Sequence, residues 1–173
     1  MKRRAAVVPP GPDDLLRWTG VIEVKRVHEP PSEADGRRVL VDRLWPRGLS
    51  RERVRLDAWI RDVAPTPELR RWFGHAPDRW PEFVRRYHAE LAANPGLPAI
   101  LARELRGERV TFLFGARDER HNNAVALKAY VESLRAAMQA YEDGGVRGLC
   151  AEGRQELALD AMRQAQLGLR SEE

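Results

Sequence analysis

The sequence predicts a small α/β domain: a mainly parallel sheet with helices packed around it, a helix-rich crossover and an extra C-terminal helix. Three observations support this fold class. Residues 109–114 (RVTFLF) form a near-continuous apolar run, which is typical of a strand buried on both faces of a parallel sheet. Two shorter strand-like segments precede this run, and a long stretch with helical spacing of apolar residues separates them from it.

The two shorter strands are expected at residues 21–27 and 38–41. The first segment (VIEVKRV) alternates apolar and charged residues, as a half-buried strand does. The second (RVLV) is rich in β-branched residues, and Pro46 and Gly48 predict a turn shortly after it.

Four short helices are expected in the crossover. Ser50 resembles a helix N-cap, and apolar residues then recur at helical spacing until Pro65. The residues that support this first helix are Leu56, Trp59, Ile60 and Val63. Thr66 can cap a second helix, a third follows the Ala-Pro-Asp sequence at 76–78, and a fourth covers residues 99–105.

The apolar stripe of residues 124–140 predicts a long amphipathic helix after the last strand. We divide the chain into a flexible N-terminal arm (1–20), an α/β domain (21–140) and a C-terminal helical extension (141–173). We expect the extension to pack on the domain or on another copy of the chain, so it could support a homo-oligomer.

The composition argues against a disordered chain and against a membrane-spanning protein. The chain is 43% hydrophobic, which is enough for a core, and no run of about 18 apolar residues predicts a membrane span. The apolar stretch 5–8 is too short for an export signal. The single cysteine, Cys150, is expected to be a buried structural thiol, and it excludes an internal disulfide. We therefore expect a cytoplasmic location.

The net charge of +4 is unevenly distributed. Residues 141–173 hold four arginines and seven acidic residues, so the main body is the basic part. Such a body can attract nucleic acid or phosphorylated molecules, although arginine-rich surfaces also arise in GC-rich genomes.

Two arginine-rich polar segments follow the second and third strands. They are VDRLWPRG (41–48) and GARDERHNN (115–123), and the second leads directly into a predicted helix N-terminus. Ligands of open α/β sheets gather beyond the carboxyl ends of the strands, where helix N-termini offer unpaired N–H groups. We therefore expect both segments to form one site.

These segments also resemble a known family. The run from VDRLWPRG through RRWFGHAPDRWPEFVRRYHAEL, with VTFLFGARDERHNNAVALKAYVE downstream, resembles the YeaO-like branch of the domain-of-unknown-function 488 (DUF488) family. The resemblance extends from about Val21 to Leu134. It implies a small α/β domain and carries no activity over to this chain.

In the first segment, Asp42 is a candidate catalytic acid or base, because a carboxylate at the end of a buried strand needs a partner. The alternative is an ion pair with Arg43 or Arg47 that shapes the loop. Both arginines are candidate anion-binding residues, since guanidinium groups suit phosphate and carboxylate. Trp45 can stack on a ring of the substrate or pack in the core.

In the second segment, His121 is the other catalytic candidate, because histidine titrates near neutral pH. Arg117, Asn122 and Asn123 are candidate substrate-binding residues. Asp118 is expected to be the N-cap of the following helix. Glu119 suits the first-turn dipole.

The absence of several common motifs argues against the functions that those motifs carry. The chain has no GxGxxG, P-loop or GxSxG sequence and no close-spaced pair of metal ligands, so no metal site is assigned and a cofactor is unknown. Our main hypothesis is a small enzyme or binding domain for an anionic, phosphorylated or nucleotide-like ligand. The alternative is a nucleic-acid-binding or regulatory module.

Overall fold

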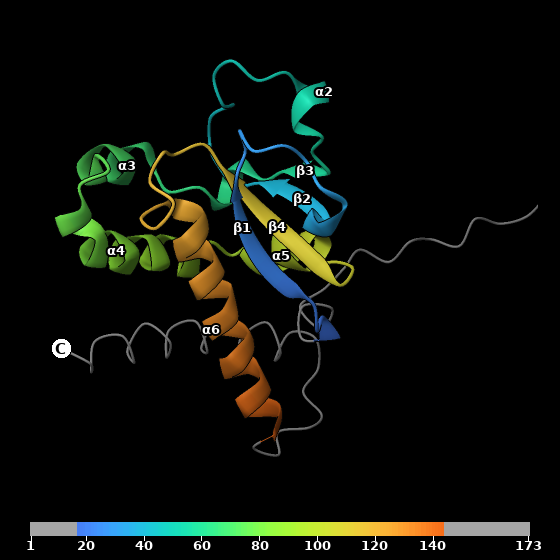
Figure 1. Cartoon of the computed structure of the whole chain (residues 1–173). Coiled ribbons are helices and arrows are strands. Elements are labelled where there is room, and N and C mark those ends of the chain that lie inside the picture. The colour runs from blue at the N-terminus through green and yellow to red at the C-terminus, as the bar shows by residue number, and fades with distance from the viewer. Residues whose placement is uncertain (1–16, 144–173) are drawn as a thin grey trace, which may run out of the picture.

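The computed structural model describes residues 17–143, which form a four-stranded, all-parallel sheet with helices around it (Figure 1). The strand order is β1-β4-β2-β3. The strands are β1 (Val21–Arg26), β2 (Arg37–Leu40), β3 (Ala58–Trp59) and β4 (Arg109–Phe114). The predicted α/β fold class is confirmed, and β4 lies at the predicted position.

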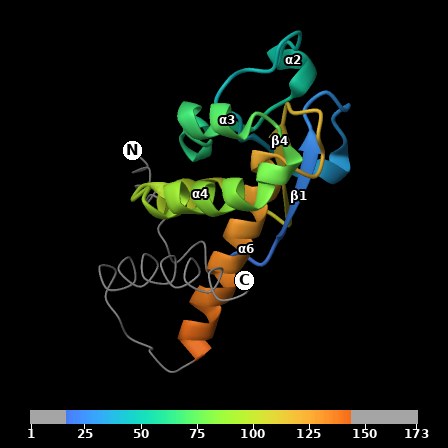
Figure 2. The ribbon, with the colours of Figure 1, turned by 90° about the vertical axis from the view of Figure 1, so that its left-hand side faces the viewer.

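Helix α6 packs directly on β1 and β4, α4 packs on α6, and α3 packs on α4, all on one side of the sheet (Figures 1 and 2). Helix α5 adds side chains to the same core. The helices are α2 (Arg51–Val54), α3 (Pro67–Phe73), α4 (Trp80–Ala92), α5 (Leu97–Glu104) and α6 (Asn123–Asp143), and the short 3-10 turns are η1 (Glu33–Asp35), η2 (Arg61–Val63) and η3 (Pro77–Arg79). The main core lies between these helices and the strands, with Val39 and Phe112 fully buried at its centre.

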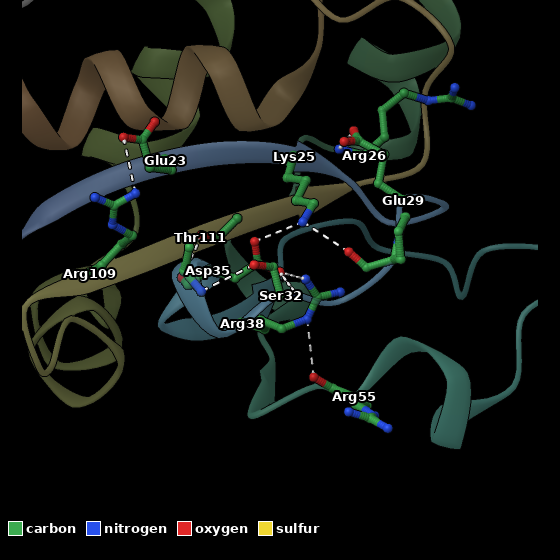
Figure 3. Close-up of polar contacts among 12 residues, drawn as sticks. Glu23, Lys25, Arg26, Glu29, Ser32, Asp35, Arg38, Arg55, Arg109 and Thr111 are labelled. Carbon is green, nitrogen blue, oxygen red and sulfur yellow. Dashed lines mark hydrogen bonds and ion pairs between the residues drawn. The ribbon is translucent and has the colours of Figure 1, made fainter.

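The other face of the sheet carries a smaller apolar cluster and a network of charges. Leu40 and Leu113 belong to the smaller cluster, which Val54 of α2 covers. Beside it, Lys25, Asp35 and Arg38 converge, as Figure 3 shows. Strand residues alternate between faces, so β4 sends Phe112 to the main core and Leu113 to the smaller one.

The predicted first crossover helix is wrong beyond its first turn. Ser50 does cap α2, since its side chain accepts a hydrogen bond from Arg53 N–H, but the helix ends at Val54. Arg55 adopts a left-handed conformation (φ 51°), which stops the helix. The chain then adds β3 beside β2, an edge strand that the sequence analysis missed. Its two residues are too few for a period-two pattern to be recognised.

Some predictions fall on residues outside the described range. They are the arm over residues 1–16, the C-terminal helical extension beyond residue 143 and the burial of Cys150. Trp18, from the end of the predicted arm, is buried and donates its indole N–H to Gly107 O at 2.6 Å. Within residues 17–143, no helix combines the length and apolar character needed to cross a membrane.

Candidate functional site

A pocket of about 240 Å³ opens at the carboxyl ends of β2 and β4. The segment after β2 contributes Asp42 and Arg43, and the segment after β4 contributes Gly115 and the two asparagines. The full lining is Asp42, Arg43, Leu44, Ala64, Pro65, Arg70, Phe73, His75, Phe83, Gly115, Ala116, Asn122 and Asn123. The two polar segments therefore meet because β2 and β4 are neighbours in the sheet.

Asp42 is the acidic residue of this lining. Its carboxylate accepts a hydrogen bond from Gly115 N–H at 2.8 Å. Burial raises the pKa of Asp42 above its ordinary value of 3.8, against the hydrogen bonds from Gly115 and Asn123 and the charges of Arg70 and His75. The pocket thus holds a carboxylate whose surroundings do not fully compensate its charge.

Glycine at position 115 allows this close approach. A Cβ atom there would lie 3.1 Å from Asp42 Oδ2. On the other side, Asn123 donates to Val41 O at 3.1 Å, which ties the first turn of α6 to the end of β2. The Asp42 carbonyl oxygen accepts a hydrogen bond from the Trp59 indole at 2.7 Å. Asp42 is therefore held by several separate segments.

Arg43 binds backbone carbonyl oxygens, a structural role that the sequence did not indicate. Its guanidinium donates to the carbonyl oxygens of Ala64 at 3.1 Å and Pro65 at 3.4 Å. Among the described residues, Asp42 forms no ion pair with Arg43 or Arg47. The expected loop-shaping pair is therefore absent, and Arg43 contacts backbone carbonyl oxygens instead. Arg43 closes the pocket against the segment that leads into α3.

Arg70 and His75 line the pocket and were missed by the sequence analysis. Arg70 lies on α3 and is exposed. Gly74 ends that helix in a left-handed conformation, and His75 also has a positive φ (56°), so the chain reverses and returns His75 to the pocket. The glycine after a helical pattern marks the reversal, but only the tertiary fold places these residues beside Asp42.

His121 does not line the pocket. Its Nδ1 lies 2.8 Å from the Asp118 carboxylate, and its ring meets the edge of Trp80 with centroids 5.2 Å apart. Asp118 also accepts hydrogen bonds from the backbone N–H groups of Arg120 and His121. The hydrogen bonds from His121 and these N–H groups lower the pKa of Asp118 to about 2. The two catalytic candidates, Asp42 and His121, thus sit in different local networks.

The N-cap of α6 is Asn122, which corrects the expectation for Asp118. The Asn122 side-chain oxygen accepts from Val125 N–H at 3.1 Å, and its amide donates to Asp118 O at 3.0 Å. Asp118 instead caps the turn before the helix. The buried Asn122 therefore shapes the pocket wall through its capping bonds.

Three further candidates lie outside the pocket lining. Arg47 and Arg117 are exposed. Trp45 is half-buried, packs against the smaller apolar cluster and donates its indole N–H to Leu49 O at 2.7 Å. Within residues 17–143, no three His, Cys, Asp or Glu side chains are grouped closely enough to hold a metal ion.

Comparison with known proteins places the chain in a family. A model described as the inactive DUF488-N3 subclade matches residues 21–146. The Escherichia coli K12 protein YeaO is 36% identical over 113 residues, which cover 65% of this chain and 98% of YeaO. The Mycobacterium tuberculosis H37Rv protein Rv3073c is 44% identical over 96 residues, which cover 56% of this chain and 79% of Rv3073c. No solved structure shows significant similarity. The chain belongs to the DUF488 family.

Proposed function

We propose that the pocket at the ends of β2 and β4 binds a small molecule with an anionic group, and that the domain binds this ligand without transforming it. The observation that carries the proposal is the placement of Arg70 and His75 in the lining of a pocket that also holds Asp42. An arginine guanidinium and a histidine ring N–H are suitable donors for a phosphate or carboxylate.

The chemistry of the lining also suggests how the ligand is oriented. An anionic group would face Arg70 and His75, because Asp42 would repel it. Asp42 is a hydrogen-bond acceptor and would face a ligand group that carries a proton, such as an amine or hydroxyl. Phe73 and Phe83 add apolar surface to the lining. At about 240 Å³ the pocket is smaller than most sites for drug-sized ligands, which favours a compact molecule over a dinucleotide.

Binding is favoured over catalysis for two reasons. The proposed acid–base pair is not assembled in one lining, because His121 bonds with Asp118 outside it. The subclade whose model matches the chain is described as inactive. A general acid or base must come within hydrogen-bond reach of the proton that it transfers. Of the two catalytic candidates, Asp42 lines the pocket and His121 does not.

Arg70 and Arg71 allow a matched test. Both are exposed on α3, but only Arg70 lines the pocket, while Arg71 pairs with Glu68 at 3.1 Å. We expect inorganic phosphate or AMP to raise the melting temperature of the wild type and of Arg71→Gln. Arg70→Gln should bind the anion about tenfold or more weakly, because a charge-assisted hydrogen bond contributes about 1.5–3 kcal/mol.

Calorimetric titration with phosphate, AMP and uncharged adenosine measures this difference. His75→Asn is a useful second variant, since asparagine tolerates a positive φ and removes the imidazole. It should also weaken anion binding. A wild-type protein that binds neither anion at millimolar concentration, or an Arg71→Gln variant as impaired as Arg70→Gln, would contradict the proposal.

A further inference from the structure

Four side chains form a continuous stack at the β3 edge of the sheet. The guanidinium carbon of Arg51 lies 5.5 Å from the Trp45 ring centroid. The Trp45 and Trp59 rings meet edge to face with centroids 5.3 Å apart. The guanidinium carbon of Arg61 lies 3.6 Å from the Trp59 centroid, which is a stacking distance. We call Arg51, Trp45, Trp59 and Arg61 the edge stack.

The rings of the edge stack are fixed by the fold. The Trp45 indole donates to Leu49 O and the Trp59 indole donates to Asp42 O, each at 2.7 Å. Both rings also pack against the smaller apolar cluster. Because their N–H groups already donate hydrogen bonds within the protein, the rings offer a ligand only their apolar surfaces. The rings are also held in place, so binding would cost little side-chain entropy.

The arginines near this edge form no close ion pairs. Residues 43–55 hold five arginines and one acidic residue, Glu52. Within the described part of the chain, Arg51, Arg53 and Arg61 form no ion pair within 4.0 Å. The Glu52 carboxylate accepts hydrogen bonds from its own backbone N–H and from Ser50, and the charge of Arg51 acts on it only at longer range. The guanidinium donors of these arginines are therefore available to an anion.

The surface of α3 and α4 provides a contrast. It is also rich in arginine, but Arg71 pairs with Glu68, and Arg86 pairs with Glu82 at 2.6 Å. Arg71 and Arg86 are thus each paired with a glutamate of the same helix, although Arg86 also lies 4.3 Å from the Trp72 ring centroid. The β3 edge combines arginines without ion pairs and fixed aromatic rings, and α2 stands apart from α3 to α6 in both views (Figures 1 and 2).

A hollow of about 260 Å³ lies within the edge stack. Its lining is Trp45, Arg51, Leu56, Asp57, Ala58 and Trp59. Such a volume suits one planar ring better than a large ligand. A carboxylate, that of Asp57, also lines it and accepts a hydrogen bond from Arg38 N–H at 2.7 Å. A base with an N–H group on its edge, such as the N3–H of thymine, would find an acceptor there.

We propose that the edge stack binds single-stranded nucleic acid, with phosphates on Arg51 and Arg61 and one base in the hollow against Trp45. Exposed bases of single strands stack on aromatic rings and on guanidinium planes. A duplex is disfavoured as the ligand, because the four-residue helix α2 is too short to act as a recognition helix in a major groove.

The first test measures the affinity for a fluorescently labelled oligo(dT) by anisotropy at several salt concentrations. The double variant Arg51→Gln/Arg61→Gln should bind about tenfold or more weakly. Its log–log salt slope should fall by about 1.4, since each lost phosphate contact on a single strand contributes about 0.7. Arg71→Gln/Arg86→Gln removes the same charge from the surface of α3 and α4 and should stay within about twofold of the wild type.

The second test asks whether bases are recognised. Trp45→Leu keeps an apolar side chain over the smaller cluster but removes the ring, so it should weaken oligo(dT) binding and leave heparin binding unchanged. Three results would overturn the proposal: no oligo(dT) binding at about 50 mM salt, heparin or duplex DNA binding as tightly as oligo(dT), or equal losses in the two double variants. Arg70→Gln should bind oligo(dT) normally, which separates this surface from the pocket.

Discussion

Asp35 and Asp42 lie at opposite ends of β2, and their carboxylates have different partners. Asp35 precedes β2, where its carboxylate pairs with Lys25 at 2.8 Å and with Arg38 and accepts from Ser32 N–H (Figure 3). Asp42 follows β2 and has one backbone N–H and one amide as hydrogen-bond partners, with no ion pair among the described residues.

The pKa values shift in opposite directions as a result. Burial alone would raise the pKa of Asp35, but the hydrogen bonds from Lys25 and Ser32 and the charge of Arg38 outweigh it and lower the pKa. At Asp42 burial prevails and the pKa rises. A compensated carboxylate is typical of a structural role, whereas an uncompensated one in a pocket is a candidate for ligand binding. The comparison therefore favours a structural role for Asp35 and a ligand-binding role for Asp42.

Breaking the Asp35 network should have the largest effect. We expect Asp35→Ala to lower the free energy of unfolding by about 3–5 kcal/mol, because it leaves the buried Arg38 without its carboxylate. Urea denaturation followed by circular dichroism measures the loss. Glu23→Ala is the matched control on the same face, since its pair with Arg109 is exposed and should contribute at most about 1 kcal/mol. Equal losses in the two variants would contradict a structural role for the Asp35 network.

Removing the N-cap of α6 should have a smaller effect. Asn122→Ala should destabilise the protein by about 1 kcal/mol, because Val125 N–H loses its acceptor. Thermal unfolding measures this, and Asn122→Ser should recover part of the loss because a hydroxyl can also cap a helix. If Asn122→Ala abolished anion binding while its stability stayed at the wild-type level, Asn122 would belong to the ligand contacts and not to the scaffold.

The sequence predicted the parts of the fold and site that depend on local patterns. The apolar run 109–114 identified β4, and the strand-end position of Asp42 placed it in the pocket. Strand β3 was missed because two residues carry no period. Arg70 and His75 were missed because only the long crossover brings α3 to the ends of β2 and β4. Such contacts depend on packing between distant segments, which no local pattern encodes.

The smallest expected change in stability comes from Asp42→Asn, and its pH dependence tests the comparison directly. The raised pKa means that the folded state binds the Asp42 proton more tightly than the unfolded state does. Wild-type stability from this group should therefore increase as pH falls through the folded pKa toward 3.8. The asparagine variant lacks this gain, so its stability relative to the wild type should be highest at neutral pH and decrease on acidification.

Asp35 should behave in the opposite sense, which provides an internal control. Its lowered pKa contributes stability above its ordinary value of 3.8, and that contribution is lost as pH falls through the folded value. Urea midpoints of Asp35→Asn and Asp42→Asn, measured from neutral pH to about pH 4 and below, should thus diverge from the wild type in opposite directions. If the urea midpoints of both variants, relative to the wild type, changed in the same direction with pH, then the pKa values of the two carboxylates would not be shifted in opposite directions. The main reason for assigning Asp42 to a ligand site would then be lost.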